Sequence, residues 1–146
     1  KGGGQSFLRT NDDYQDFIFE ADVWLEVRGN SGIQFRSYLK GDSRICGYQA
    51  EIDPSARRWS GGIFVECDNW IQNLKDNPQG RAAFDLDGWN HYSIECIGDH
   101  LRIWVNGIPT ADHVDNRFSE GFIALQVHSG RQGTIHWRNP RMFVLK

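Results

Sequence analysis

The chain has 146 residues and a net charge of -3, with 39% hydrophobic and 24% charged residues. This length suits one folded domain over residues 1–146, and the composition is not that of a disordered chain. No apolar run approaches the roughly 20 residues that a membrane-spanning helix needs. Acidic and basic residues are interspersed without a basic stripe, so we expect neither nucleic acid nor membrane as a partner.

The N-terminal segment Lys1–Gln5 is rich in glycine and lacks the apolar core of a signal peptide. The chain opens in the middle of a strand-like pattern. We therefore expect the first strand or strands of the domain, or a processed leader, to precede Lys1.

Alternation of apolar and polar residues dominates the rest of the chain. In 17–25, Phe17 and every second residue after it are apolar, whereas Glu20, Asp22 and Trp24 share the other side, which is typical of a half-buried strand. The same alternation predicts strands over 33–38, 47–53, 61–66, 92–96, 101–105, 122–128 and 134–144. Because no segment has a sustained helical period, we expect an all-β, two-sheet antiparallel sandwich of the jelly-roll type.

Two further expectations follow from this pattern. Residues 68–88 are polar and interrupted by Pro78 and Gly80, which predicts a long loop with at most a short helical turn near 70–74. Such a loop either borders a site or merely connects strands. The predicted core residues are Phe19, Val23, Phe35, Ile52, Ile63, Ile94, Ile103, Val105, Leu125 and Val127.

The three cysteines have neither zinc-site spacing nor a redox C-x-x-C motif. If 45–53 and 61–67 form a hairpin with Tyr48 opposite Val65, then Cys46 lies opposite Cys67. That arrangement permits a cross-strand disulfide, and two buried free thiols would explain the residues equally well.

The side of the strands opposite the apolar phase carries amides, carboxylates, arginine and tryptophan, with hardly any lysine or threonine. Its members are Glu20, Asp22, Trp24, Gln34, Arg36, Gln49, Glu51, Asp53, Arg102, Trp104, Gln126 and His128. An ordinary solvent-facing surface is the alternative, but this content favours a ligand-binding face. Planar polar groups suit sugar hydroxyls, and exposed aromatic rings suit the CH faces of sugars.

Within this set, Glu51 and Asp53 place two carboxylates on one side of a strand, about 6 to 7 Å apart. Such a pair can raise one pKa and take part in acid–base chemistry. Carboxylate oxygens would also suit a divalent metal ion. No metal-ligand set stands out, and no cofactor motif is evident.

Several motifs in order resemble one known family, the domain of unknown function 1080, now described as the 3-keto-disaccharide hydrolase domain. They are Gly29-Asn-Ser-Gly-Ile33 followed by Arg36, Gly47-Tyr-Gln-Ala-Glu-Ile-Asp53, Gly88-Trp-Asn90, Trp104-Val-Asn-Gly107, Gly121-Phe-Ile-Ala-Leu-Gln-Val-His128 and Trp137-Arg-Asn139. The resemblance covers nearly the whole chain. It implies a concanavalin A-like lectin/glucanase fold and a secreted or periplasmic protein.

The resemblance also implies an activity on glycosides oxidised at C3. The ketone acidifies the C2 proton, so a base can remove it, the enolate can expel the C1 aglycone, and water can then add. By this resemblance Glu51 or Asp53 would be the base, and Arg36 and His128 would face the developing charge. The residues expected to bind substrate are Asn30, Gln34, Gln49, Gln126 and, at the rim, Trp104.

One departure from the family leaves the function open. The family pattern reads Glu-x-Gln where this chain has Gln49-x-Glu51, so the carboxylate is displaced by one position on the same face. The leading hypothesis is a 3-keto-glycoside hydrolase or lyase, and the alternative is a carbohydrate-binding, lectin-like module without activity. A retaining glucanase of the same fold ranks third, because the chain lacks the second glutamate of the usual Glu-x-Asp-x-(x)-Glu motif.

Overall fold

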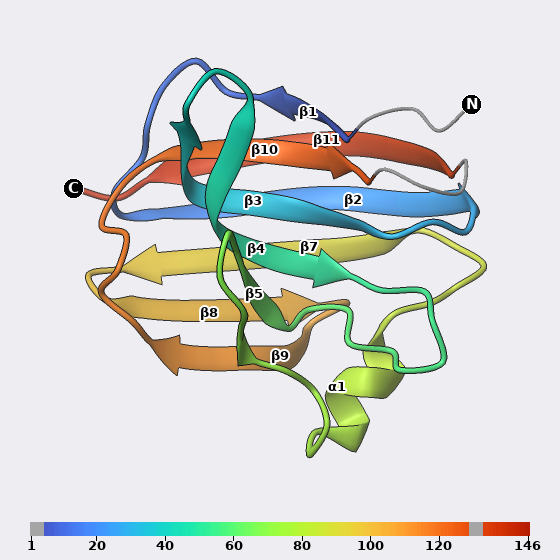
Figure 1. The fold of residues 1–146 in the computed structure, drawn as a ribbon. Helices are drawn as coiled ribbons and strands as arrows, with labels where there is room; N and C mark the ends of the chain where they lie inside the picture. Colours follow the sequence, from blue (N-terminus) through green and yellow to red (C-terminus); the bar gives the residue numbers. More distant parts are fainter. Residues whose placement is uncertain (1–4, 129–132) are drawn as a thin grey trace.

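A computed structural model of the chain describes residues 5–128 and 133–146 (Figure 1). The elements are β1 (Ser6–Arg9), β2 (Phe17–Val27), β3 (Ser31–Lys40), β4 (Arg44–Ile52), β5 (Ile63–Glu66), β6 (Trp70–Gln72), α1 (Pro78–Ala83), β7 (Asn90–Ile97), β8 (His100–Val105), β9 (Ile108–Val114), β10 (Phe122–Val127) and β11 (Thr134–Val144). The strands form two antiparallel sheets, which confirms the predicted all-β sandwich. Within the described ranges, no helix is long and apolar enough to cross a membrane.

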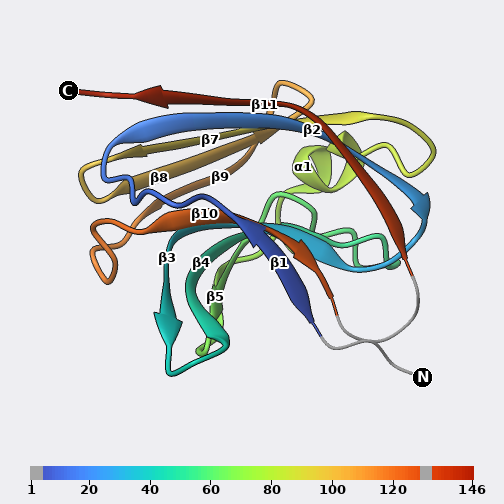
Figure 2. The same cartoon turned by 90° about the horizontal axis from the view of Figure 1, so that it is seen from above.

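The two sheets pack face to face and enclose the hydrophobic core. One has the strand order β1-β10-β3-β4-β5-β6 and the other β11-β2-β7-β8-β9. Figure 2 shows the six-stranded sheet bending away from the five-stranded sheet at both ends, so that its outer face is concave. Side chains on that face are therefore brought toward one another.

The core follows the predicted alternation closely. Eight of the ten predicted core residues are buried: Phe19, Val23, Phe35, Ile52, Ile63, Ile94, Ile103 and Val105. Leu125 is partly buried and packs against the core. Val127 is 42% exposed, so its prediction was wrong; it is the last residue of β10 and lies where the sheet ends.

Four elements escaped the sequence prediction. The short edge strands β1 and β6, and the outer strand β9, have too few alternating residues to be distinctive. The only helical turn in the 68–88 segment is α1, which starts at Pro78 rather than near residue 70. Asn77 caps it by accepting a hydrogen bond from the Gly80 amide at 2.8 Å.

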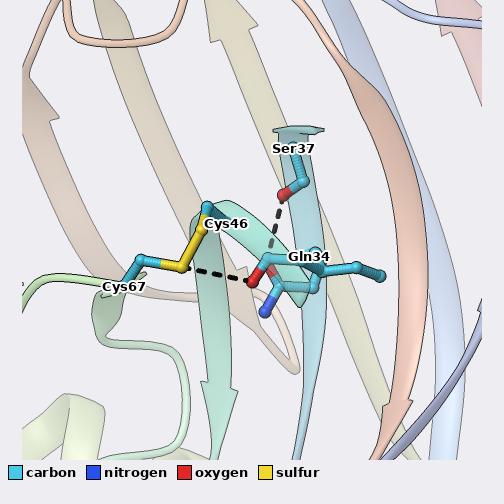
Figure 3. Close-up of a disulfide and its surroundings, with 5 residues drawn as sticks. Gln34, Ser37, Cys46 and Cys67 are labelled. Carbon is cyan, nitrogen blue, oxygen red and sulfur yellow. Dashed lines mark hydrogen bonds between the residues drawn. A yellow bond between two sulfur atoms is a disulfide. The ribbon is translucent and has the colours of Figure 1, made fainter. Parts of the chain in front are cut away.

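The hairpin of β4 and β5 has the predicted register. Tyr48 lies opposite Val65 and Ala50 opposite Ile63, so the pairing brings Cys46 to Cys67. The two cysteines form a disulfide with Cα atoms 5.4 Å apart, which settles the alternative left open by the sequence. Figure 3 shows this disulfide beside Gln34 and Ser37 of the neighbouring strand β3.

Removal of the disulfide is expected to lower stability without changing the fold. It closes a loop with a sequence separation of 21 residues, so Cys46→Ala/Cys67→Ala should cost about 3 kcal/mol of unfolding free energy through the freer unfolded chain. Urea denaturation of the oxidised wild type and the double variant measures this difference. Equal midpoints in the two proteins would contradict the expectation.

Candidate functional site

The concave face of the six-stranded sheet carries polar side chains that are nevertheless buried. Gln34 and Gln126 are fully buried, and Gln49 and Glu51 are 2% and 5% exposed. On a solvent-facing sheet surface such side chains are normally exposed. These side chains are buried by one another and by the surrounding loops. Such burial is typical of a binding site and not of an ordinary solvent-facing sheet surface.

A directional series of hydrogen bonds runs along this face and ends at Glu51. The Ser37 hydroxyl donates to Gln34 Oε1 at 3.0 Å, and Gln34 Nε2 donates to Gln49 Oε1 at 2.5 Å. Gln49 Nε2 in turn donates to Glu51 Oε2 at 2.9 Å, while Asn30 Nδ2 donates to Glu51 Oε1. Both carboxylate oxygens of Glu51 are thus fixed as acceptors.

This setting has an electrostatic consequence for Glu51. Burial raises the pKa of its carboxyl group above the ordinary value, although the hydrogen bonds from Asn30 and Gln49 act in the opposite direction. Neighbouring Asp53 also raises this pKa and Arg57 lowers it. Glu51 is consequently a buried hydrogen-bond acceptor whose pKa depends on the groups that contact it.

An aromatic and cationic wall stands on one side of Glu51. Phe64, directly opposite Gln49, packs against Trp70 with ring centroids 5.4 Å apart, and Trp59 meets Trp70 at 5.1 Å. The Arg57 guanidinium lies 4.6 Å from the Trp59 ring centroid and 5.3 Å from that of Trp70. The flat apolar rings therefore lie beside the hydrogen-bonded side chains of Gln49 and Glu51, which we call the floor of the site.

Two neighbouring hollows open onto this face. The first, which we call the Glu51 pocket, has a volume of about 210 Å³; besides Asn30 and His128 it is lined by Gln49, Glu51, Arg57, Phe64, Glu66 and Trp70. The second, the Pro54 pocket, measures about 360 Å³; besides Asn30 and His128 it is lined by Arg28, Gly29, Asp53, Pro54 and Ser55. Asn30 and His128 are common to both.

Gln126 and Glu66 face each other across the same sheet surface. Gln126 Nε2 donates to Glu66 Oε1 at 3.4 Å, and burial raises the pKa of Glu66. Within the described residues, the buried Oε1 of Gln126 has no hydrogen-bond partner. Gln126 and Gln34 line neither pocket, and they reach the site through their hydrogen bonds to Glu66 and Gln49.

Asp53 mainly holds the loop that follows β4. Its carboxylate accepts hydrogen bonds from the Ser55 amide at 3.0 Å, the Trp59 amide at 3.2 Å and Arg57 Nε at 2.8 Å. Burial alone would raise its pKa, but these hydrogen bonds hold the pKa of Asp53 below the ordinary value. Asp53 thereby positions Arg57 at the Glu51 pocket.

The structure does not bring Arg36 into this site. It sits at a β-bulge with φ 44°, which turns its side chain away from the phase assumed from alternation. The 1% exposed guanidinium donates to the carbonyl oxygens of Gln15 and Gly98, at 2.6 and 2.7 Å for the shortest contacts, and to Asp16. Arg36 thus ties loops together between the sheets.

Trp104 is also elsewhere. It belongs to β8 of the five-stranded sheet, and its strand neighbours Ile103 and Val105 are fully buried in the core. Trp104 therefore points outward on the opposite side of the sandwich. The same correction applies to the other polar residues of that sheet, which are Glu20, Asp22, Trp24 and Arg102.

Sequence reasoning missed four residues of the Glu51 pocket. Phe64 and Glu66 share the phase of Gln49 across the predicted hairpin, so extending the polar face to β5 would have found them. Arg57 and Trp70 offered no such signal, because one lies in a loop and the other begins a three-residue strand.

Within residues 5–128 and 133–146, no three His, Cys, Asp or Glu side chains lie close enough together to hold a metal ion. Glu51 and Asp53 have their oxygens engaged by amides and by Arg57.

Comparison with known proteins places the chain among carbohydrate-related domains. The carbohydrate-binding module CBM66 from Bacillus subtilis superposes with a TM-score of 0.75 at 25% identity, over 97% of this chain and 83% of the module. A candidate glycosyl hydrolase from Parabacteroides distasonis has a TM-score of 0.65 at 19% identity, over 97% of this chain and 84% of that chain, which shows the shared fold.

A curated levanase from Bacillus sp. (strain L7) is 24% identical over 136 residues. The match covers 89% of this chain but 14% of the levanase, so this chain corresponds to a small part of that enzyme. The family model for the 3-keto-alpha-glucoside-1,2-lyase-like domain matches residues 1–142. As the sequence motifs and the sandwich fold indicate, the chain belongs to this family of 3-keto-alpha-glucoside-1,2-lyase-like domains.

Proposed function

We propose that the domain is a carbohydrate-binding module that holds a glycan on the concave face around Glu51. The observation that carries this proposal is the Glu51 carboxylate, fixed by Asn30 and Gln49 as an acceptor beside the Phe64–Trp70 wall. Sugar hydroxyls can donate to such an acceptor while an apolar sugar face packs on a ring. Pockets of this kind combine a few placed polar groups with aromatic surface.

The comparisons support binding as the function of this part of the chain. The TM-score is higher for the carbohydrate-binding module than for the glycosyl hydrolase described above. The match to a short part of a levanase suggests levan, a fructan, as the first ligand to test.

A 3-keto-glycoside lyase or hydrolase is the second candidate, favoured by the family and by the raised pKa of Glu51, which suits a general base. Such chemistry needs a hydrogen-bond donor or a cation to stabilise the enolate, and Arg36 is engaged away from the pocket. Arg57 and His128, which line the Glu51 pocket, would have to take that part.

The retaining glucanase is disfavoured by the state of Asp53. That mechanism needs two carboxyl groups free to act on either side of the scissile bond. Asp53 forms an ion pair with Arg57 and accepts hydrogen bonds from two backbone amides of its own loop, so its carboxylate is committed to holding that loop.

We also propose that the protein is exported, to the periplasm or outside the cell. The Cys46–Cys67 disulfide supports this, because such bonds persist in oxidising compartments and are rare in the cytosol.

Binding and turnover can be separated in one set of measurements. The domain is titrated calorimetrically with levan, maltose and maltotriose, and is incubated with a 3-keto-α-glucoside while aglycone release is followed. We expect saturable binding to at least one plain sugar and no aglycone release. Release that is abolished by Glu51→Gln would establish the enzyme instead, and the absence of both binding and release would refute both functions.

Gly32→Ala is expected to weaken sugar binding about tenfold while the fold is retained. A Cβ at position 32 would lie 2.4 to 2.7 Å from atoms of the Gln49 side chain, so Gln49 must move and its hydrogen bond to Glu51 is lost. Calorimetric titration measures the affinity. The matched control is Gly88→Ala, whose Cβ would meet only the Asp85 carboxylate; equal affinities in the two variants would contradict the assigned role of Gln49.

A further inference from the structure

The two hollows on the concave face adjoin each other. The Glu51 pocket and the Pro54 pocket share Asn30 and His128. Asn30 Nδ2 donates to Glu51, which lines the Glu51 pocket, and to the carbonyl oxygen of Ile52. Ile52 directly precedes Asp53, which lines the Pro54 pocket, so Asn30 contacts the backbone or side chains at both pockets. A ligand that fills one pocket therefore reaches the edge of the other at these two side chains.

Size indicates how much ligand each pocket holds. The Glu51 pocket, at about 210 Å³, lies below the roughly 300 Å³ at which ordinary small-molecule sites begin. Such a small hollow suits one sugar ring and not a chain. The Pro54 pocket, at about 360 Å³, accommodates a second ring of similar size.

The two pockets differ in what they offer a sugar. The Glu51 pocket has a buried acceptor floor and an aromatic wall, so it can select the orientation of a ring. The Pro54 pocket offers donors from the exposed side chains of Arg28 and Ser55 beside the apolar Pro54 ring. Asp53, which lines the Pro54 pocket, is held by its own loop and by Arg57.

We propose that the concave face comprises two sugar subsites, so that its ligand is an oligosaccharide of at least two units that crosses from the Glu51 pocket to the Pro54 pocket between Asn30 and His128. This inference rests on the proposed carbohydrate-binding function and adds the minimum length of the ligand. The Glu51 pocket is the selective subsite, and the Pro54 pocket adds affinity for the adjoining unit.

A chain-length series tests the proposal. Fructose, levanbiose and levantriose, and in parallel glucose, maltose and maltotriose, are titrated into the full chain by calorimetry. In the series that binds, the disaccharide is expected to bind about tenfold more tightly than the monosaccharide, and the trisaccharide to add less than twofold.

Ser55→Trp should fill the Pro54 pocket while keeping the backbone amide that donates to Asp53. We expect it to remove the disaccharide gain and leave monosaccharide affinity unchanged. Ser119→Trp introduces the same ring at an exposed position that lines neither pocket, so it should behave as wild type.

Arg28→Ala gives a milder second variant. Arg28 forms an exposed ion pair with Asp87 at 2.6 Å, so Asp87→Ala breaks the same pair and serves as its control. Only Arg28→Ala is expected to reduce the disaccharide gain.

Equal affinities for monosaccharide and disaccharide, or a full disaccharide gain in Ser55→Trp, would overturn the two-subsite proposal while leaving carbohydrate binding intact. No binding in either series would instead refute the proposed function, and the subsites with it.

Discussion

Arg36→Met is expected to destabilise the domain by about 3 kcal/mol, because it removes the hydrogen bonds and the ion pair through which one buried guanidinium holds two loops to β3. The guanidinium joins β3 to the carbonyl oxygens of Gln15 and Gly98, which lie before β2 and in the turn between β7 and β8. Methionine retains much of the apolar volume but supplies no donor. The loss should appear as a lower urea midpoint with an unchanged denaturant dependence.

The control for this variant is Arg44→Met, which removes an arginine from an exposed position and should change stability by no more than about 0.5 kcal/mol. Sugar affinity of folded Arg36→Met should equal that of wild type, since Arg36 lines neither pocket. If Arg36→Met had normal stability but impaired sugar binding, Arg36 would have to be assigned to the binding site.

The sequence predicted the fold well because most strands are long and half-buried. Alternation locates β2, β7 and β8, and the hairpin register that pairs Tyr48 with Val65 was sufficient to bring Cys46 opposite Cys67. Short strands at sheet edges, such as β1 and β6, bury too little for their pattern to stand out from loops.

The candidate site was predicted only in part, for two physical reasons. Alternation tells which residues share a side of a strand but not which sheet the strand joins, so Trp104 was grouped with Glu51 although they lie on opposite faces of the sandwich. A bulge also breaks the period of two, and the left-handed backbone at Arg36 reverses its side chain. Gln34, Gln49 and Glu51, on regular backbone in β3 and β4, were grouped correctly, whereas Asn30 was named only among the residues expected to bind substrate.

Local interactions beyond any periodic pattern explain the residues that were missed. Arg57 reaches the pocket because Asp53 holds it, and its guanidinium then covers Trp59 and Trp70. This arrangement depends on the path of the loop after Pro54, which alternation does not encode.

Glu51→Gln is expected to lower sugar affinity about 100-fold. Both carboxylate oxygens accept hydrogen bonds from amide nitrogens, of Asn30 and of Gln49. A glutamine at position 51 must present its own NH2 group to one of those donors, so the side chain has to turn and the acceptor offered to the sugar is lost. Calorimetric titration with the sugar that binds wild type best measures the loss.

A compensating variant separates the shape of the site from the role of the carboxylate. In Asn30→Asp/Glu51→Gln the donor and acceptor of that contact are exchanged and the net charge is restored. We expect thermal stability to return toward wild type while sugar affinity stays low, because the acceptor no longer lies on the floor of the Glu51 pocket. Recovery of affinity in the double variant would mean that Glu51 only holds Asn30 in place.

The pH dependence of binding provides a further check on the same residue. Since burial raises the pKa of Glu51, the ionised form that accepts sugar hydroxyls is lost at a higher pH than in an exposed glutamate. Wild-type affinity should therefore fall on acidification through that raised pKa, and it should be retained above it. Glu51→Gln should show no such fall, and a parallel fall in both proteins would assign the titration to another group, such as Glu66, whose pKa burial also raises.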